Sequence, residues 1–129
     1  MNPPPTKQWA LLELALADYD KISKTPGYYI NMSTWHMPDE KDSTKCYVCL
    51  AGCVMAGTLK MPKDTVFSPE SFDIGWSIRL YDLDYHRVGN YRDKRGKWCS
   101  YDITHHFEYP IQWRADMDRF VQFLKEQDL

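Results

Sequence analysis

The stretch that decides the fold reads CYVCLAGCVMAG and occupies residues 46–57. Its cysteines, Cys46, Cys49 and Cys53, follow the spacing i, i+3 and i+7, which places all three sulfurs on one face of an α-helix. Hydroxyl residues at 43–44 are suitable N-caps. The pattern therefore predicts a helix that begins just before the first cysteine and runs to about residue 58.

Three interpretations of the cysteines remain open: core packing, a metal site, and a redox-active or nucleophilic cysteine, for which Cys46 at the predicted helix start is the best candidate. Free cysteine is among the most buried residue types, and ordinary core residues surround these three, so packing is favoured. The second interpretation is a zinc site in which Cys46 and Cys49 are joined by Cys99 and His36, or by His105 and His106. Such a site would make the protein a zinc-binding protein or a metal-dependent enzyme. Gly52 lies inside the predicted helix, where glycine is costly, and this indicates that another backbone packs closely there.

Composition limits the choice of protein class. The 129 residues are enough for a single globular domain spanning 1–129, and the proline-rich residues 1–5 are expected to form a flexible start. The net charge of −2 creates no global field that favours nucleic acid or an anionic membrane. No apolar run approaches the roughly 18 residues of a membrane span, and the first residues do not resemble a signal peptide. We therefore expect a cytoplasmic protein with no membrane partner.

Periodicity predicts a mainly α fold with about four helices. Apolar residues at helical spacing predict helices over 7–23 and 110–127, the first capped by Thr6. Ser68-Pro69-Glu70 resembles a helix start, so a third helix is expected over 68–88, with apolar stripes on two faces that would make it central to the packing. The segments 28–34 and 98–103 are rich in β-forming residues and predict a short β pair.

Other polar clusters have plainer explanations. Asp82, Asp84 and His86 share the third predicted helix, and a solvated face is favoured over a metal or acid–base site. The pair at 105–106 is expected to be exposed, or to have one histidine satisfied in the core. The turn at 92–98 interleaves basic and aromatic residues, as single-stranded nucleic-acid surfaces do, but a charged turn over a core tryptophan is favoured.

Part of the chain resembles a group of small bacteriophage and bacterial proteins. Trp35-His36 precedes a Cys-x-x-Cys-Leu-Ala-Gly run at 46–52, and the segment 84–90 ends in Arg-x-Gly-Asn, as in that group. The additional Cys53 departs from the commonest form of the pattern. The resemblance implies a phage-type source without a defined activity, and it implies an accessory or host-directed role by association.

The same resemblance suggests two structural roles. Trp35 would pack over the cysteine-containing helix, and Arg87 would meet backbone carbonyls near a helix C-terminus.

No nucleophile elbow, phosphate-binding glycine loop or His-Glu-x-x-His motif is present in the sequence, which lowers the expectation of an enzyme without excluding one. The leading hypothesis is a small non-catalytic protein without a cofactor that binds a host or phage protein. Aromatic residues make up 15% of the chain and are frequent interface anchors. Nucleic acid is a less favoured partner, and a homodimer is a further option. The anchors expected from the sequence are Tyr28, Tyr29, Tyr91, Arg92 and Arg95.

Overall fold

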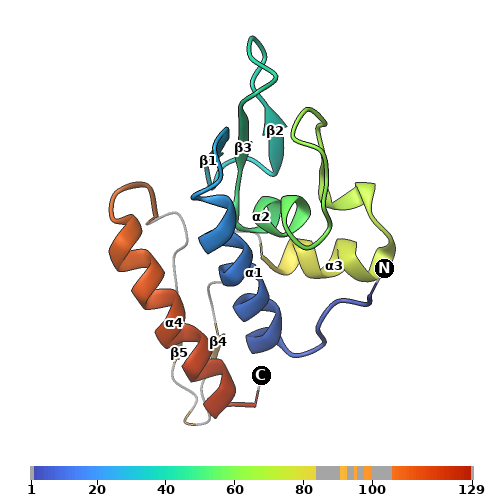
Figure 1. Cartoon of the computed structure of the whole chain (residues 1–129). Helices are drawn as coiled ribbons and strands as arrows, with labels where there is room; N and C mark the ends of the chain where they lie inside the picture. Colours follow the sequence, from blue (N-terminus) through green and yellow to red (C-terminus); the bar gives the residue numbers. More distant parts are fainter. Residues whose placement is uncertain (1, 84–90, 93–94, 96–97, 100–105, 129) are drawn as a thin grey trace.

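A pair of antiparallel helices, a small sheet and two shorter helices make up the fold (Figure 1). The computed structural model describes residues 2–83, 91–92, 95, 98–99 and 106–128. Four α-helices and a three-stranded sheet confirm the predicted mainly α class with a small β component. No described helix is both long and apolar enough to cross a membrane.

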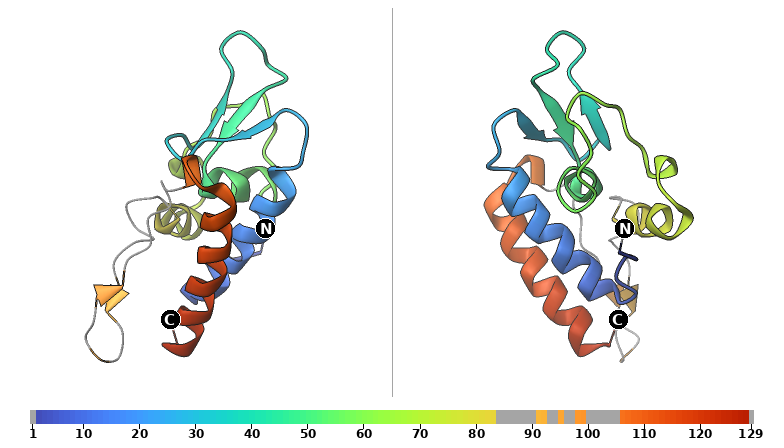
Figure 2. Two further views of the ribbon diagram at one scale, coloured as in Figure 1. Left: turned by 90° about the vertical axis from the view of Figure 1, so that its left-hand side faces the viewer. Right: turned by 45° about the vertical axis from the view of Figure 1, so that its right-hand side comes forward.

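The two long helices match their predictions closely. Helix α1 spans Gln8–Ile22 and helix α4 spans Pro110–Glu126, and they lie side by side in opposite directions (Figure 2). Their facing stripes supply much of the core: Leu12, Leu16, Tyr19 and Ile22 from α1, and Trp113, Met117, Phe120 and Leu124 from α4. The prediction of Thr6 as the N-cap is wrong by one position, because the N-cap is Lys7. The Lys7 side chain makes no capping hydrogen bond.

Residues 46–48 form a strand, which corrects the predicted start of the cysteine-containing helix. Strand β3 (Cys46–Val48) lies between parallel β1 (Tyr28–Ile30) and antiparallel β2 (His36–Pro38). The helical spacing of the cysteines was misleading, because pairing on both sides of β3 supplies the backbone hydrogen bonds that a helix would otherwise provide. The buried face of the sheet carries Cys46 and Val48 against helix α2.

Helix α2 is short and fully packed. It spans Leu50–Ala56, and Cys49 is its N-cap, with the Gly52 N–H donating to Cys49 Sγ at 3.4 Å. A Cβ built on Gly52 would overlap the Trp35 carbonyl oxygen, so the predicted close approach of another backbone is confirmed. The main chain at Trp35 therefore lies directly against this helix.

The third predicted helix is shorter than expected. Ser68-Pro69-Glu70 begins a single 3₁₀ turn, η1 (Pro69–Ser71), after which the chain extends at Phe72. Helix α3 spans Ile74–Asp82, capped by Asp73 Oδ1, which accepts from Trp76 N–H at 3.0 Å. The prediction that both faces of this helix are buried is wrong, because Ile74 is 80% exposed.

The remaining β structure is a two-stranded ladder. Strand β4 (Tyr91–Arg92) pairs with β5 (Trp98–Cys99), so the predicted segments 28–34 and 98–103 both contain strands but pair with other partners. The predicted C-terminal part of the third helix and Arg87 lie outside the described residues.

The proline-rich start packs against helix α3, where Pro4 lies beside Gly75. The Asn2 carbonyl accepts a hydrogen bond of 3.0 Å from Trp76 Nε1, within the segment that we expected to be flexible.

Candidate functional site: an aromatic groove

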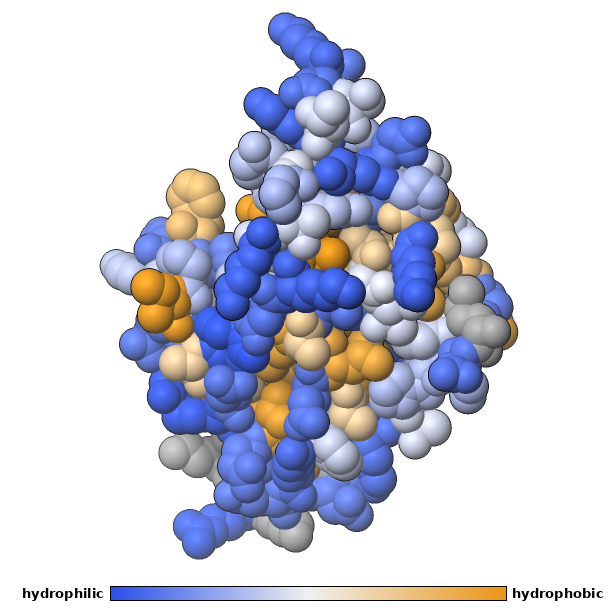
Figure 3. All heavy atoms as spheres, viewed as in Figure 1, coloured by the Kyte–Doolittle hydropathy of each residue, from blue (hydrophilic) through white to orange (hydrophobic). Residues whose placement is uncertain are grey.

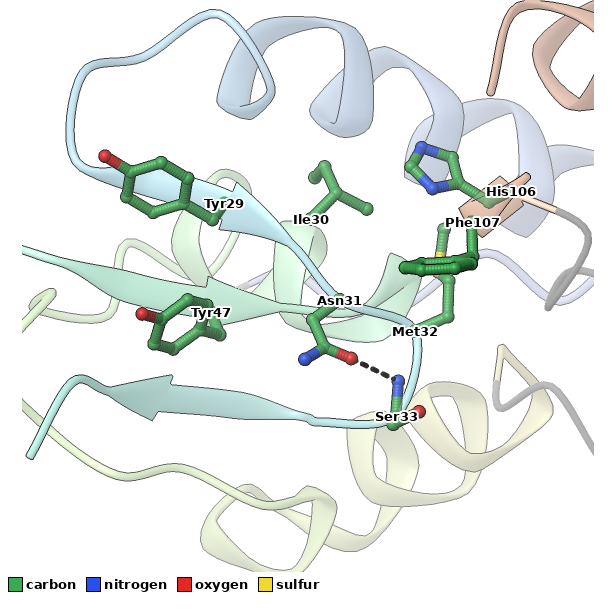
Figure 4. Close-up of a pocket in the computed structure, with 8 residues that line it drawn as sticks. All are labelled: Tyr29, Ile30, Asn31, Met32, Ser33, Tyr47, His106 and Phe107. Atoms are coloured by element: carbon green, nitrogen blue, oxygen red, sulfur yellow. Dashed lines mark hydrogen bonds between the residues drawn. The ribbon is translucent and has the colours of Figure 1, made fainter. Parts of the chain in front are cut away.

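An open groove with aromatic walls crosses the outer face of the sheet. Its volume is about 440 Å³. Tyr29 and Tyr47 form one end, and His106 and Phe107 form the other (Figure 4). Strand β1 and the residues that follow it form the floor between the two ends: Ile30, Asn31, Met32 and Ser33. We call this feature the aromatic groove.

The sheet register explains the tyrosine end. Tyr29 on β1 is paired with Tyr47 on β3, and Tyr47 is paired with Met37 on β2, so all three side chains lie on one face. Alternate residues of each strand face the core, which leaves this row toward solvent. The tyrosine ring centroids are 5.9 Å apart, and Tyr29 is 47% exposed. Apolar residues on a solvent-facing sheet surface are a typical sign of a binding surface.

The other end is held by a partly buried hydrogen bond. Tyr19 on α1 lies 2.7 Å from His106 Nε2, and the His106 ring packs edge-on against Trp113 of α4. Burial lowers the pKa of His106, which favours the neutral ring, and the ring shares one hydrogen bond with the Tyr19 hydroxyl through Nε2. The expectation that one of the two adjacent histidines is satisfied in the core is met by His106.

Anchoring His106 leaves the next side chain exposed. Phe107 is 91% exposed, the largest value among the exposed large hydrophobic side chains of the described residues. Ile111, in the first turn of α4, is 88% exposed. Figure 3 shows apolar side chains projecting over the N-terminal end of α4, at the left of the molecule. The aromatic groove therefore continues into an apolar surface at its Phe107 end.

The lining determines what the aromatic groove can bind. None of its eight lining residues carries a formal charge at pH 7. The tyrosine and Phe107 rings offer apolar faces, and the Asn31 amide and the hydroxyls offer a few hydrogen-bonding groups. Such a surface suits an apolar ligand with exposed backbone polar groups.

Of the predicted zinc ligands, the structure brings two into contact. Cys46 Sγ lies 3.7 Å from His36 Nδ1 and 3.8 Å from Nε2. Nearly equal distances to both nitrogens place the sulfur over the ring face, away from the in-plane direction along which an imidazole nitrogen bonds a metal or a proton. His36 Nδ1 donates instead to the Thr65 carbonyl at 2.8 Å.

The other predicted ligands are placed differently. Cys49 caps helix α2, and the side chain of Cys99 lies outside the described residues. Cys46, Cys49 and Cys53 are all buried, and burial raises the pKa of Cys46 to about 11. Among the residues whose side chains are described, no group of three or more potential metal ligands is gathered at one point.

The predicted partner anchors divide into three groups. Tyr29 lines the aromatic groove, whereas Tyr28 is half-buried on the core side of the sheet, beside the His36 ring and beneath Lys63. Arg95 is exposed. The backbones of Tyr91 and Arg92 form β4, but their side chains lie outside the described residues, as does most of the basic turn.

Among the other predicted polar residues, Asp82 pairs with Arg79 at 3.1 Å on α3. Asp84, His86 and His105 lie outside the described residues.

Sequence reasoning missed Tyr47 and Phe107 as site residues. Tyr47 was assigned to a helix, and only its pairing with Tyr29 across the sheet reveals its outward position. Phe107 stands in an ambiguous segment, and no local pattern shows that its neighbour is held by Tyr19, 87 positions away.

Comparison of the chain with protein-family models, with curated proteins and with solved structures finds no match. Its function is therefore inferred from geometry and side-chain chemistry.

Proposed function

We propose that this protein is a small non-catalytic binding protein that recognises another protein through the aromatic groove. The observation that carries the proposal is the 91% exposure of Phe107 beside a groove whose opposite wall is formed by Tyr29 and Tyr47. Burying a phenylalanine side chain stabilises a complex by about 2 kcal/mol. Aromatic side chains are also the residues most often found as energetic anchors at protein interfaces.

The resemblance to small phage proteins supports a role for this binding during phage infection of a host cell. On that basis, the protein is a phage-encoded accessory factor that acts in the cytoplasm of its host and binds a host protein. A binding role needs no cofactor.

The test compares two double variants as baits in lysate of the natural host cell. Phe107→Ala with Tyr29→Ala removes both walls of the aromatic groove. Ile74→Ala with Ile78→Ala is the matched control, because it removes two exposed apolar side chains from α3. All four side chains are at least 47% exposed, so we expect both variants to remain folded.

We expect a protein captured by the wild type and by the α3 control to be lost from the groove variant. Capture that survives in the groove variant, or no specific capture at all, would contradict the proposal. Binding that weakens steeply with salt and persists after groove substitution would instead favour nucleic acid as the partner.

A further inference from the structure

A second hollow adjoins the aromatic groove at Tyr47. Tyr47 lines both spaces, and the second hollow, of about 390 Å³, is lined by residues 37–41 of strand β2 and the turn that follows it. The Tyr47 hydroxyl donates to Asp39 Oδ2 at 2.7 Å, so the ring that walls the apolar space also contacts the first acidic residue of the turn. A ligand long enough to fill both hollows would pass over Tyr47.

The aromatic lining of this surface favours an extended ligand. The groove is lined by side chains of β1, an edge strand of the sheet, and by Tyr47 of the central strand β3. Polyproline II segments dock on aromatic-lined surfaces of this kind, and their unpaired carbonyls can accept hydrogen bonds from hydroxyl and amide groups.

The charges at the two ends define the ligand further. The turn after β2 carries three carboxylates, Asp39, Glu40 and Asp42, against Lys41 and Lys45. Hydrogen bonds from Tyr47 and from backbone N–H groups hold the pKa of Asp39 below its usual range, so this carboxylate is ionised at neutral pH. None of these carboxylates forms an ion pair within the described part of the chain.

The Phe107 end also carries an acid. Glu108 follows Phe107 directly and is exposed, again with no ion pair to another described residue. An uncharged aromatic centre is therefore flanked by carboxylates at both ends. A ligand with complementary charge would carry positive groups at its two ends.

On these grounds, and resting on the proposed function, we infer that the aromatic groove binds an extended, proline-containing segment of a partner protein, apolar in its middle and carrying Lys or Arg on both flanks.

A displayed library of random linear peptides tests the inference, with the intact wild-type protein and the Phe107→Ala/Tyr29→Ala variant as separate targets. We expect the wild type to enrich peptides with central prolines and basic flanks, and the groove variant to lose them. Enrichment of acidic, helical or proline-free peptides that still need Phe107 and Tyr29 would overturn the inference and leave the proposed function standing. If the groove variant enriches the same peptides as the wild type, the inference is overturned. The proposed function is tested separately, and it fails if the groove variant still captures the same protein from lysate.

The charge requirement is tested with the most enriched synthetic peptide. Glu40→Gln with Glu108→Gln should weaken its affinity about fivefold at low salt and flatten the salt dependence. Glu126→Gln, which removes one exposed acid at the far end of α4, is the control for loss of a negative charge away from the aromatic groove and should change neither. If the double substitution and the control change the affinity for the peptide equally, the proposal that basic ligand flanks meet Glu40 and Glu108 is overturned.

Discussion

Gly52 is the position at which an added methyl group should reduce the stability of the fold most clearly. Its α-carbon lies against the Trp35 carbonyl, which also accepts the Cys49 N–H at 3.2 Å, so the β2–α2 junction is backbone on backbone. Gly52→Ala must push these segments apart, and we expect it to lower the free energy of unfolding by about 1–3 kcal/mol.

Gly75→Ala is the matched control for this substitution. A Cβ at Gly75, in the first turn of α3, meets only ordinary contacts at 3.4 Å or more, so we expect a gain of up to about 0.5 kcal/mol. Urea denaturation of both variants measures the difference. Equal effects at the two positions would show that close packing at Gly52 is not what requires glycine.

Thiol labelling tests whether the cysteine sulfurs act as packing atoms in the core. In a Cys99→Ser variant, the remaining thiols are those of Cys46, Cys49 and Cys53, all buried. With its pKa raised to about 11, Cys46 is almost entirely in the unreactive thiol form at pH 8. We expect labelling by a thiol reagent to be limited by opening of the fold and to be unchanged by a chelator. Rapid labelling, or labelling accelerated by the chelator, would contradict the packing interpretation.

His36 makes stability depend on pH in a defined direction. It is 1% exposed, and burial lowers its pKa from the ordinary value near 6.5. As pH falls, the unfolded chain therefore takes up the proton first, so this contribution to stability is fully present above about pH 6.5 and is lost below it.

His36→Asn tests this dependence, since the amide can keep a donor to the Thr65 carbonyl. We expect a lower overall stability and a weaker dependence on pH between about 7 and 5, measured by urea denaturation at each pH. The dependence that remains includes His106, whose pKa is shifted in the same direction. An unchanged slope in the variant would mean that His36 is not neutral in the folded protein.

At the scale of elements, the Arg114 guanidinium of α4 links this helix to α1. Arg114 donates to both carboxylate oxygens of Asp20 at 2.8 Å and also contacts Asp118. Because the pair bridges residues 94 positions apart and is bidentate, we expect Arg114→Ala to cost about 1 kcal/mol.

Arg119→Ala is the control for Arg114, since Arg119 is exposed and, among the described residues, forms an ion pair only with Asp116 on its own helix. It should cost no more than a few tenths of a kcal/mol, as measured by thermal and urea denaturation. A cost equal to that of Arg114→Ala would show that the bridge between helices adds nothing beyond a surface ion pair.

Elements with strong local signals were predictable and the others were not. Helices α1 and α4 hold a 3.6-residue apolar period for many turns, so sequence alone predicts them. Strand β3 is three residues long, and its conformation depends on β1 and β2, which the cysteine spacing does not reveal. The start of α3 was misplaced because Ser68-Pro69 begins a 3₁₀ turn, while Asp73 before Ile74 gives the true capping signal.

At the scale of the whole molecule, the aromatic groove exists because three distant segments meet. Tyr29 could be proposed from the sequence as an exposed anchor, but Tyr47 and Phe107 reach it only through the sheet register and the Tyr19–His106 hydrogen bond. A site built from long-range contacts leaves little local pattern. This explains why the candidate zinc ligands, which share a visible motif, were easier to find, although His36 and Cys46 are the only two that make contact among those with described side chains.

The central claim is that the aromatic groove is the binding surface. The most direct measurement is an NMR titration of the ¹⁵N-labelled protein with the peptide that the wild type enriches most from the displayed library, whatever its composition. The account predicts amide shift changes concentrated at residues 28–33, at Tyr47 and at 106–108, with α3 unaffected. Shift changes centred on α3, or on any surface that excludes both Tyr29 and Phe107, would contradict it.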